Sequence, residues 1–163
     1  MTPRRWAMVT ILLVLALISA TIYYFTIIQQ PKWDEMKLIK QRLATEANVV
    51  EWDQLAKYVW DEVVWVAEGA VIDQEINTVI LRDEQPPLII LQNELIDRTQ
   101  IEAQFMQSYS NEDTVELLSS RLGFVAGQPV WEIYYKMDQQ YNYHFYEATT
   151  GQTIDNYRLI NKH

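Results

Sequence analysis

The residues of this chain that could do chemistry are mostly carboxylates. The sequence has 22 aspartates and glutamates, two histidines and no cysteine. Without cysteine there can be no disulfide, no thiolate metal site and no cysteine nucleophile. A glycosidase-like mechanism needs two suitably separated carboxyl groups, and the candidate pairs are Asp61/Glu62 and Glu112/Asp113. Each pair sits at an expected turn or strand start, where acids are usually solvated, so we expect no catalytic pair.

Nucleophilic and phosphate-binding motifs are also missing from the sequence. His144 is the one internal histidine, since His163 is the last residue. The serines that would need it as a base are Ser108, Ser110, Ser119 and Ser120. No G-x-S-x-G elbow occurs, and the four glycines never cluster into a phosphate loop. We predict no enzyme activity, no cofactor and no metal, with His144 solvated on a strand face; calcium binding by scattered acids stays open, although EF-hand spacing is lacking.

The net charge of −9 bears on the kind of partner. Nucleic-acid binding needs a surplus of lysine and arginine, and this chain has 13 of them against 22 acids. A charge of this sign also disfavours anionic polymers. Protein partners and cations remain as the classes that the charge favours.

The first thirty residues contain a long apolar segment. No charged residue occurs between Trp6 and Ile28, and about 20 apolar residues can cross a bilayer as a helix. Arg4 and Arg5 precede this run, which predicts a cytoplasmic N-terminus. We therefore expect an uncleaved, single-pass transmembrane anchor over residues 1–30, with the C-terminal domain in the extracellular space.

A cleaved signal peptide is the main alternative for this segment. Its apolar core would last about 7–15 residues and end at a small-x-small site. Here the apolar residues continue past Ser19-Ala20 as far as Ile28, which favours an anchor. A buried soluble helix is disfavoured because the segment has no polar face.

After Pro31 the pattern becomes that of a small α+β domain. Between Asp34 and Asn48 the apolar residues recur at spacings of three and four, as on one helix face. Runs of β-branched and aromatic residues follow up to Leu91 and predict antiparallel strands, with Gly69 and Pro86-Pro87 in the connections.

The same order of elements begins again after residue 92. Asp97 is expected to cap a helix, with Gln100 as its reciprocal partner. Strands are expected at residues 130–137, 141–148 and 153–159. We therefore predict two units, 31–92 and 93–163, each a helix packed on an antiparallel sheet and related by an internal duplication.

Aromatic rings are densest in residues 128–154 of the second unit. Alternation along this segment predicts a hairpin with one face in the core and one in water, and a turn at residues 138–140. The residues assigned to the core face are Trp131, Ile133, Tyr143 and Phe145. The opposite face carries the candidate partner-binding surface, which consists of Tyr134, His144 and Tyr146.

Residues 129–154 resemble the closing motif of PepSY-type domains, in which a Trp-Glu pair is followed by a turn, an aromatic strand and a glycine. Trp131-Glu132 and Gly151 stand where that motif needs them. With an apolar leader and two such units, the chain resembles the TseB/YpmB family of low-GC Gram-positive bacteria, the second unit matching better than the first. The resemblance implies tandem cystatin-like, PepSY-like α+β units.

The resemblance also implies a function. It implies a non-enzymatic, membrane-anchored regulator outside the cell, which acts on cell-wall elongation through a penicillin-binding transpeptidase. Sheet edges or the Tyr134/His144/Tyr146 face would make the contact. Two other functions stay open: modulation of a secreted peptidase, and binding of peptidoglycan fragments or small ligands through exposed rings.

Overall fold

In the computed structural model, the backbone is described for residues 3–110 and 114–158. Within these ranges the described side chains leave out residues 3–5, 7, 9, 27–29, 31 and 155–158. Contacts divide the chain into two units, Met1–Arg42 and Leu43–His163.

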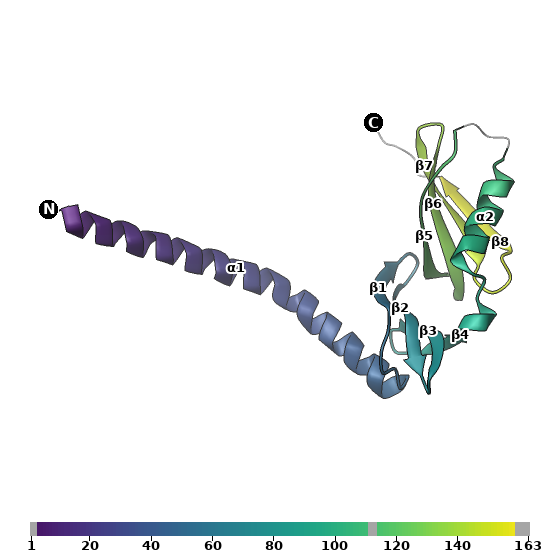
Figure 1. The fold of residues 1–163 in the computed structure, drawn as a ribbon, viewed down its shortest axis with the longest axis horizontal. Coiled ribbons are helices and arrows are strands. Elements are labelled where there is room, and N and C mark those ends of the chain that lie inside the picture. Colours follow the sequence, from purple (N-terminus) through teal and green to yellow (C-terminus); the bar gives the residue numbers. More distant parts are fainter. Residues whose placement is uncertain (1–2, 111–113, 159–163) are drawn as a thin grey trace. The chain divides into compact units, whose positions relative to one another are not determined.

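The first unit is the greater part of one helix, α1, which runs from Pro3 to Glu46 (Figure 1). The apolar run and the amphipathic segment after Pro31 belong to this single element, whereas the sequence predicts two. Leu13 and Leu17, two of its described apolar side chains, are 63% and 65% exposed.

The expected transmembrane anchor over residues 1–30 is not supported. Among the residues that the structure describes, no helix has both the length and the apolar character needed to cross a membrane. This finding contradicts the anchor, and with it the single-pass, cell-membrane localisation inferred from it. The apolar residues are one stretch of a helix that goes on through charged sequence to Glu46.

Two antiparallel sheets make up most of the second unit and confirm the α+β class (Figure 1). The first sheet contains β1 (Gln54–Val59), β2 (Val63–Ile72), β3 (Glu75–Arg82) and β4 (Leu88–Leu91). The second contains β5 (Glu116–Val125), β6 (Gln128–Met137), β7 (Gln140–Glu147) and β8 (Thr153–Arg158). In each sheet the strands lie in chain order. β5 was not predicted, because the residues of its first half are largely exposed and do not alternate.

The connection between the two sheets runs from residue 92 to residue 115. Its described helices are the 3-10 helix η1 (Gln92–Glu94) and helix α2 (Arg98–Ser108). Asp97 caps α2 as predicted. Its side chain accepts the backbone N–H of Thr99 at 2.8 Å, whereas the expected capping box would have paired Asp97 with Gln100. The predicted boundary between units 31–92 and 93–163 falls in this connection and stays a prediction.

The central hairpins of the two sheets share local features. Both β2–β3 and β6–β7 turn on an Asp-Gln pair with positive φ, at Asp73-Gln74 and Asp138-Gln139. Three residues past each turn glutamine lies a buried asparagine, Asn77 or Asn142, whose amide donates to the carbonyl two residues before it at 3.0 Å. Matching features of this kind are expected if the halves are related by duplication.

The second sheet is covered on both faces. On one face α2 packs against β5 and β6, and the Phe105 ring lies 4.8 Å from that of Tyr135. On the other face Trp60, just after β1, lies edge-on to Phe145 at 4.9 Å. Side chains on both faces of β6 and β7 are therefore buried over much of the strands' length, which explains why aromatic rings occur on both faces.

Candidate functional site

The structure separates the three residues of the predicted partner-binding surface. The β6–β7 turn holds two residues, so Met137 pairs with Gln140 and Trp131 pairs with Tyr146. Directly paired residues share a face, so His144 and Tyr146 lie with Trp131 and Ile133 beneath α2. Tyr134 pairs with Tyr143 and lies on the opposite face.

Burial removes two of these residues from the surface. Tyr146 is 1% exposed and His144 is 8% exposed, so the prediction that this face meets water is wrong for both. The cause is the turn, since a slip of one residue in register moves every side chain of a strand to the other face. Their role in binding a partner stays an untested prediction.

His144 is part of the packing beneath α2. Its ring stacks on Tyr146 at 4.4 Å, and its nitrogens lie 3.4 Å from the Tyr109 hydroxyl and 3.3 Å from that of Thr153. Burial lowers the pKa of His144, and burial also raises the pKa of Tyr146 to about 12. These groups are therefore neutral at physiological pH.

Tyr134 belongs to a ladder of half-exposed tyrosines. Its ring stacks on Tyr143 at 4.8 Å and on Tyr141 at 5.7 Å, and the Lys136 ammonium lies 5.9 Å from the Tyr141 ring. Because the rings stack on one another, their faces are largely used within the ladder. This arrangement disfavours a flat platform for a sugar or another planar ligand.

Three of the groups considered for catalysis, Asp61, Ser108 and Ser120, are held in structural contacts. Asp61 accepts the backbone N–H groups of Glu62 and Ala126, the latter at 2.7 Å. Ser108 donates to a carbonyl of its own helix, and Ser120 contacts Glu102. Glu112/Asp113 lie outside the described residues. Over the described part of the chain, no group of three histidine or acidic side chains could hold a metal ion.

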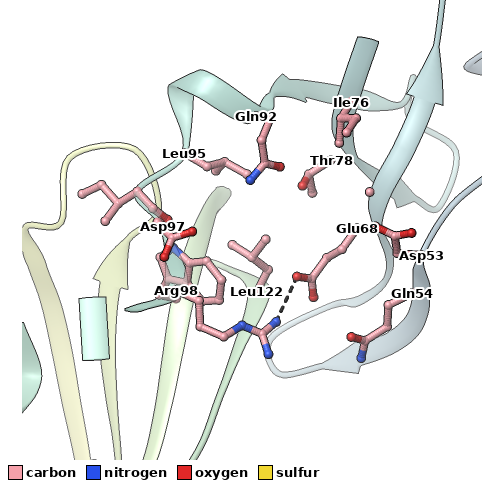
Figure 2. Close-up of a pocket in the computed structure, with 13 residues that line it drawn as sticks. Asp53, Gln54, Glu68, Ile76, Thr78, Gln92, Leu95, Asp97, Arg98 and Leu122 are labelled. Carbon is pink, nitrogen blue, oxygen red and sulfur yellow. Dashed lines mark hydrogen bonds and ion pairs between the residues drawn. The ribbon is translucent and has the colours of Figure 1, made fainter. Parts of the chain in front are cut away.

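A groove between the two sheets brings polar groups together (Figure 2). Its volume is about 420 Å³. We call it the inter-sheet groove, and it is lined by Asp53, Gln54, Glu68, Gly69, Ile76, Thr78, Gln92, Leu95, Ile96, Asp97, Arg98, Leu122 and Trp131. It thus takes residues from the first sheet, from the connection and from the second sheet.

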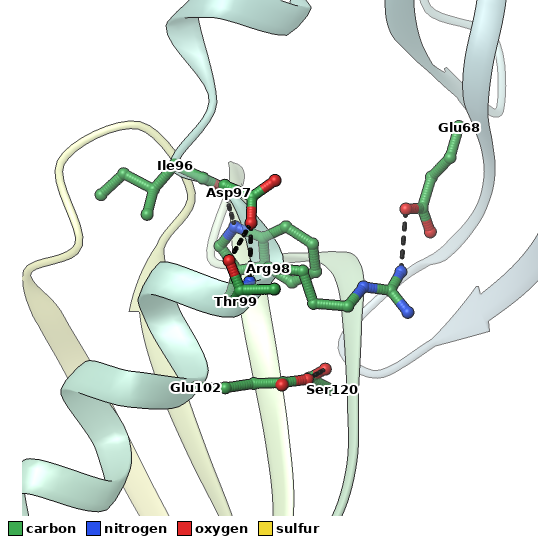
Figure 3. Close-up of polar contacts among 8 residues, drawn as sticks. Glu68, Ile96, Asp97, Arg98, Thr99, Glu102 and Ser120 are labelled. Atoms are coloured by element: carbon green, nitrogen blue, oxygen red, sulfur yellow. Dashed lines mark hydrogen bonds and ion pairs between the residues drawn. The ribbon is translucent and has the colours of Figure 1, made fainter.

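A β-bulge shapes the wall of the groove on the first sheet. The pairing of β2 with β3 shifts between Ala67 and Ala70, and Gly69 has a φ of +66°. Bulges of this kind re-aim a side chain. Here Glu68 points across the groove, where its Oε2 accepts a hydrogen bond from Arg98 Nη2 at 3.0 Å (Figure 3).

The opposite wall is built by the start of α2. Thr99 donates to Asp97 through its backbone N–H and its hydroxyl, and these hydrogen bonds lower the pKa of Asp97 (Figure 3). The Arg98 guanidinium lies 5.4 Å from the ring of Trp131, and the indole N–H donates to the Ile96 carbonyl at 2.9 Å. Arg98 is therefore held between an indole face and a carboxylate.

The Trp131-Glu132 pair joins elements on both faces of the second sheet. Trp131 fixes the entry to α2, as described above. Glu132 is 1% exposed and accepts hydrogen bonds from the Tyr58 hydroxyl at 2.8 Å and from Arg121 Nε at 2.7 Å. Glu132 therefore stabilises the junction between the sheets, and Trp131 lines the inter-sheet groove.

Comparison with known proteins bears on the fold. A solved structure of the YpmB protein from Bacillus subtilis is similar, with a TM-score of 0.61 over 77% of this chain and 96% of that chain. The fold is YpmB-like. At 18% sequence identity the likeness is one of fold alone. No family model and no curated protein sequence matches the chain.

Sequence reasoning missed the inter-sheet groove within this YpmB-like fold. Glu68 and Arg98 are 30 residues apart, and neither belongs to a motif. The signal that could have found the groove is Gly69, which was expected in a connection but lies within β2 at a bulge. The sequence analysis singled out Asp97, but as a helix cap and not as a residue of the groove.

Proposed function

We propose that this protein is a non-enzymatic interaction module, whose inter-sheet groove binds a segment of a protein partner. The observation that carries the proposal is the groove itself, an open site of about 420 Å³ at the junction of two sheets. Ligand sites are commonly found at such junctions, and this volume lies in their usual range of roughly 300–1,000 Å³.

The surroundings of the reactive groups support a role without catalysis. A general base needs a titrating group within reach of substrate. Here Glu132 is enclosed by Tyr58 and Arg121, and His144 is buried beneath α2. Asp97 is engaged as a helix cap.

We further propose that the partner is a cell-wall synthesis enzyme of the penicillin-binding transpeptidase class. The support for this step is the sequence resemblance of residues 129–154 together with the YpmB-like fold. The net charge of −9 agrees with a protein partner, because like charges would repel an anionic wall polymer.

Site-specific photo-crosslinking in intact cells tests this function. A photoreactive amino acid replaces Gln92, which is exposed on the groove, and in a matched control it replaces Gln107, which is exposed on α2 outside the groove lining. We expect mass spectrometry to identify a transpeptidase linked through position 92 and not through position 107.

Other outcomes of this experiment are equally informative. Capture of a secreted peptidase at position 92 would support the peptidase-modulator hypothesis in place of the transpeptidase. Equal labelling at both positions, or labelling only at position 107, would contradict a role of the groove in binding.

A further inference from the structure

The charges that line the inter-sheet groove are unbalanced. Asp53, Glu68 and Asp97 contribute three carboxylates, and Arg98 is the one basic residue of the lining. We propose that the groove binds a lysine or arginine side chain carried by an extended peptide segment. This inference rests on the proposed function, and it names the chemistry of the partner segment.

Glu68 and Asp53 are the anionic groups available to an incoming cation. A carboxylate has about four acceptor sites, and the ion pair with Arg98 uses one contact of Glu68. The Glu68 side chain is 22% exposed, so it is half-enclosed yet reachable from the groove. Asp53 is exposed on the same wall of the groove, beside Gly69 (Figure 2).

A hydroxyl directed into the groove adds a polar contact for a ligand. Thr78 lines the groove although its residue is only 1% exposed, and Figure 2 shows its hydroxyl directed into the groove. Its side chain makes no hydrogen bond to the residues that the structure describes. The hydroxyl is therefore placed to make a hydrogen bond with a polar atom of a bound segment.

The apolar lining suits the stem of a long basic side chain. Lysine and arginine bury their methylene groups on apolar surface while the charged head stays with polar groups. The exposed Ile76 and the half-buried Leu95 supply such a surface in the groove.

The extent of the groove favours a peptide over a small amine. Its first wall has residues from β1, β2 and β3, and it continues to Gln92 after β4. The volume of about 420 Å³ exceeds one side chain, and an extended backbone can use the remaining amide and hydroxyl groups.

Fluorescence anisotropy with the full-length protein tests the proposal. The probe is the labelled peptide Thr-Val-Thr-Lys-Thr-Val-Thr, with a second peptide in which norleucine replaces lysine. We expect saturable binding of the lysine peptide below about 1 mM, and affinity at least about tenfold weaker for the norleucine peptide. Glu68→Gln and Asp53→Asn should each weaken lysine-peptide binding by about threefold to tenfold.

Matched variants separate charge loss from loss of folding. Glu116→Gln removes one exposed acid from β5, outside the groove lining, and should change the affinity less than about twofold. Amide NMR spectra of each variant report folding, and shifts confined to residues 53–54, 68–69 and 96–98 would locate the peptide. Thr78→Val should weaken binding of both peptides equally, because it removes a contact to the backbone rather than to the cation.

The proposal fails if the lysine and norleucine peptides bind equally, if neither binds, or if Glu68→Gln has no larger effect than Glu116→Gln. Its failure is distinguishable from that of the proposed function. A transpeptidase that cross-links through position 92 with unchanged yield in Glu68→Gln would retain the function and reject the cation site. Lysine-peptide binding in the groove without any transpeptidase capture would retain the cation site and reject the transpeptidase as partner.

Discussion

The Tyr58 hydroxyl of the first sheet donates a hydrogen bond of 2.8 Å to Glu132 of the second, across 74 residues of sequence. Arg121 binds the other oxygen of the same carboxylate, and its guanidinium lies 5.0 Å from the Tyr58 ring. A buried carboxylate needs such partners because its desolvation is costly. Burial, with the neighbouring Glu132 charge, raises the pKa of Tyr58, so the hydroxyl keeps its proton and remains a donor.

We therefore expect Tyr58→Phe to destabilise the fold by about 1–3 kcal/mol, because Glu132 loses one of its two partners while it stays buried. Urea denaturation followed by tryptophan fluorescence measures the change in the free energy of unfolding. Tyr141→Phe is the matched control, since that ring is 37% exposed, and should change stability by less than about 0.5 kcal/mol. Equal effects of the two substitutions would contradict the structural role of the Tyr58–Glu132 contact.

The Tyr58–Glu132 contact marks what sequence reasoning could and could not supply. The Asp97 cap was predicted because capping is local. Trp131 and Phe145 were correctly assigned to the core, and both are buried. The contact itself depends on how two sheets meet, and no local pattern encodes that.

The faces of β6 and β7 were mispredicted for a definite physical reason. A three-residue turn at residues 138–140 would place Tyr143 on the same face of the sheet as Trp131. The turn in the structure has two residues, so Tyr146 pairs with Trp131 and shares its face. Asp138-Gln139 lacks the glycine that usually marks a two-residue hairpin turn, so the length of the turn could not be predicted from the sequence. The burial of His144 follows from this difference and from the covering of both faces of the sheet.

The two-residue turn between β6 and β7 also gives a prediction about stability. Gln139 has a φ of 64°, a conformation that costs a residue with a Cβ about 1–2 kcal/mol and glycine little. We expect Gln139→Gly to stabilise the protein by about 0.5–1 kcal/mol in thermal or urea denaturation, after glycine's greater entropy in the unfolded chain is subtracted.

The neighbouring residue supplies the control for this substitution. Gln140 is the first residue of β7 and is exposed. Gln140→Gly should destabilise by about 0.5–1 kcal/mol, because glycine in a strand costs entropy and gains no conformational relief there. Destabilisation by Gln139→Gly of the same size would show that the turn is not strained in the folded protein.

The burial of His144 gives a pH dependence. Burial lowers its pKa in the folded state below the ordinary 6.5, so the unfolded chain binds more protons in mildly acidic solution. The stability contributed by the neutral imidazole is therefore present above about pH 6.5 and is lost as the pH falls below it.

We expect the free energy of unfolding to fall between pH 7 and pH 5, and to fall less steeply in His144→Gln, which has no titrating ring at this position. NMR titration of the imidazole measures the pKa directly. A value at or above 6.5 would contradict the burial of His144 beneath α2.

The bulge in β2 links stability to the inter-sheet groove through Gly69. A Cβ at this position would lie 2.1 Å from an Asp53 carboxylate oxygen, and the φ of +66° is strained for any other residue. Gly69→Ala should therefore cost the conformational penalty of about 1–2 kcal/mol together with a displacement of Asp53.

Gly127→Ala separates the conformational penalty from the effect of displacing Asp53. Gly127 also has a positive φ, +80°, in the β5–β6 turn, but a Cβ there meets no atom within 4 Å. We expect Gly127→Ala to lower the free energy of unfolding by the conformational term alone, and Gly69→Ala to lower it further. Only Gly69→Ala should weaken binding of the lysine peptide, because it moves the Asp53 and Glu68 carboxylates. Equal peptide affinities in the two variants would show that the bulge does not set the geometry of the groove.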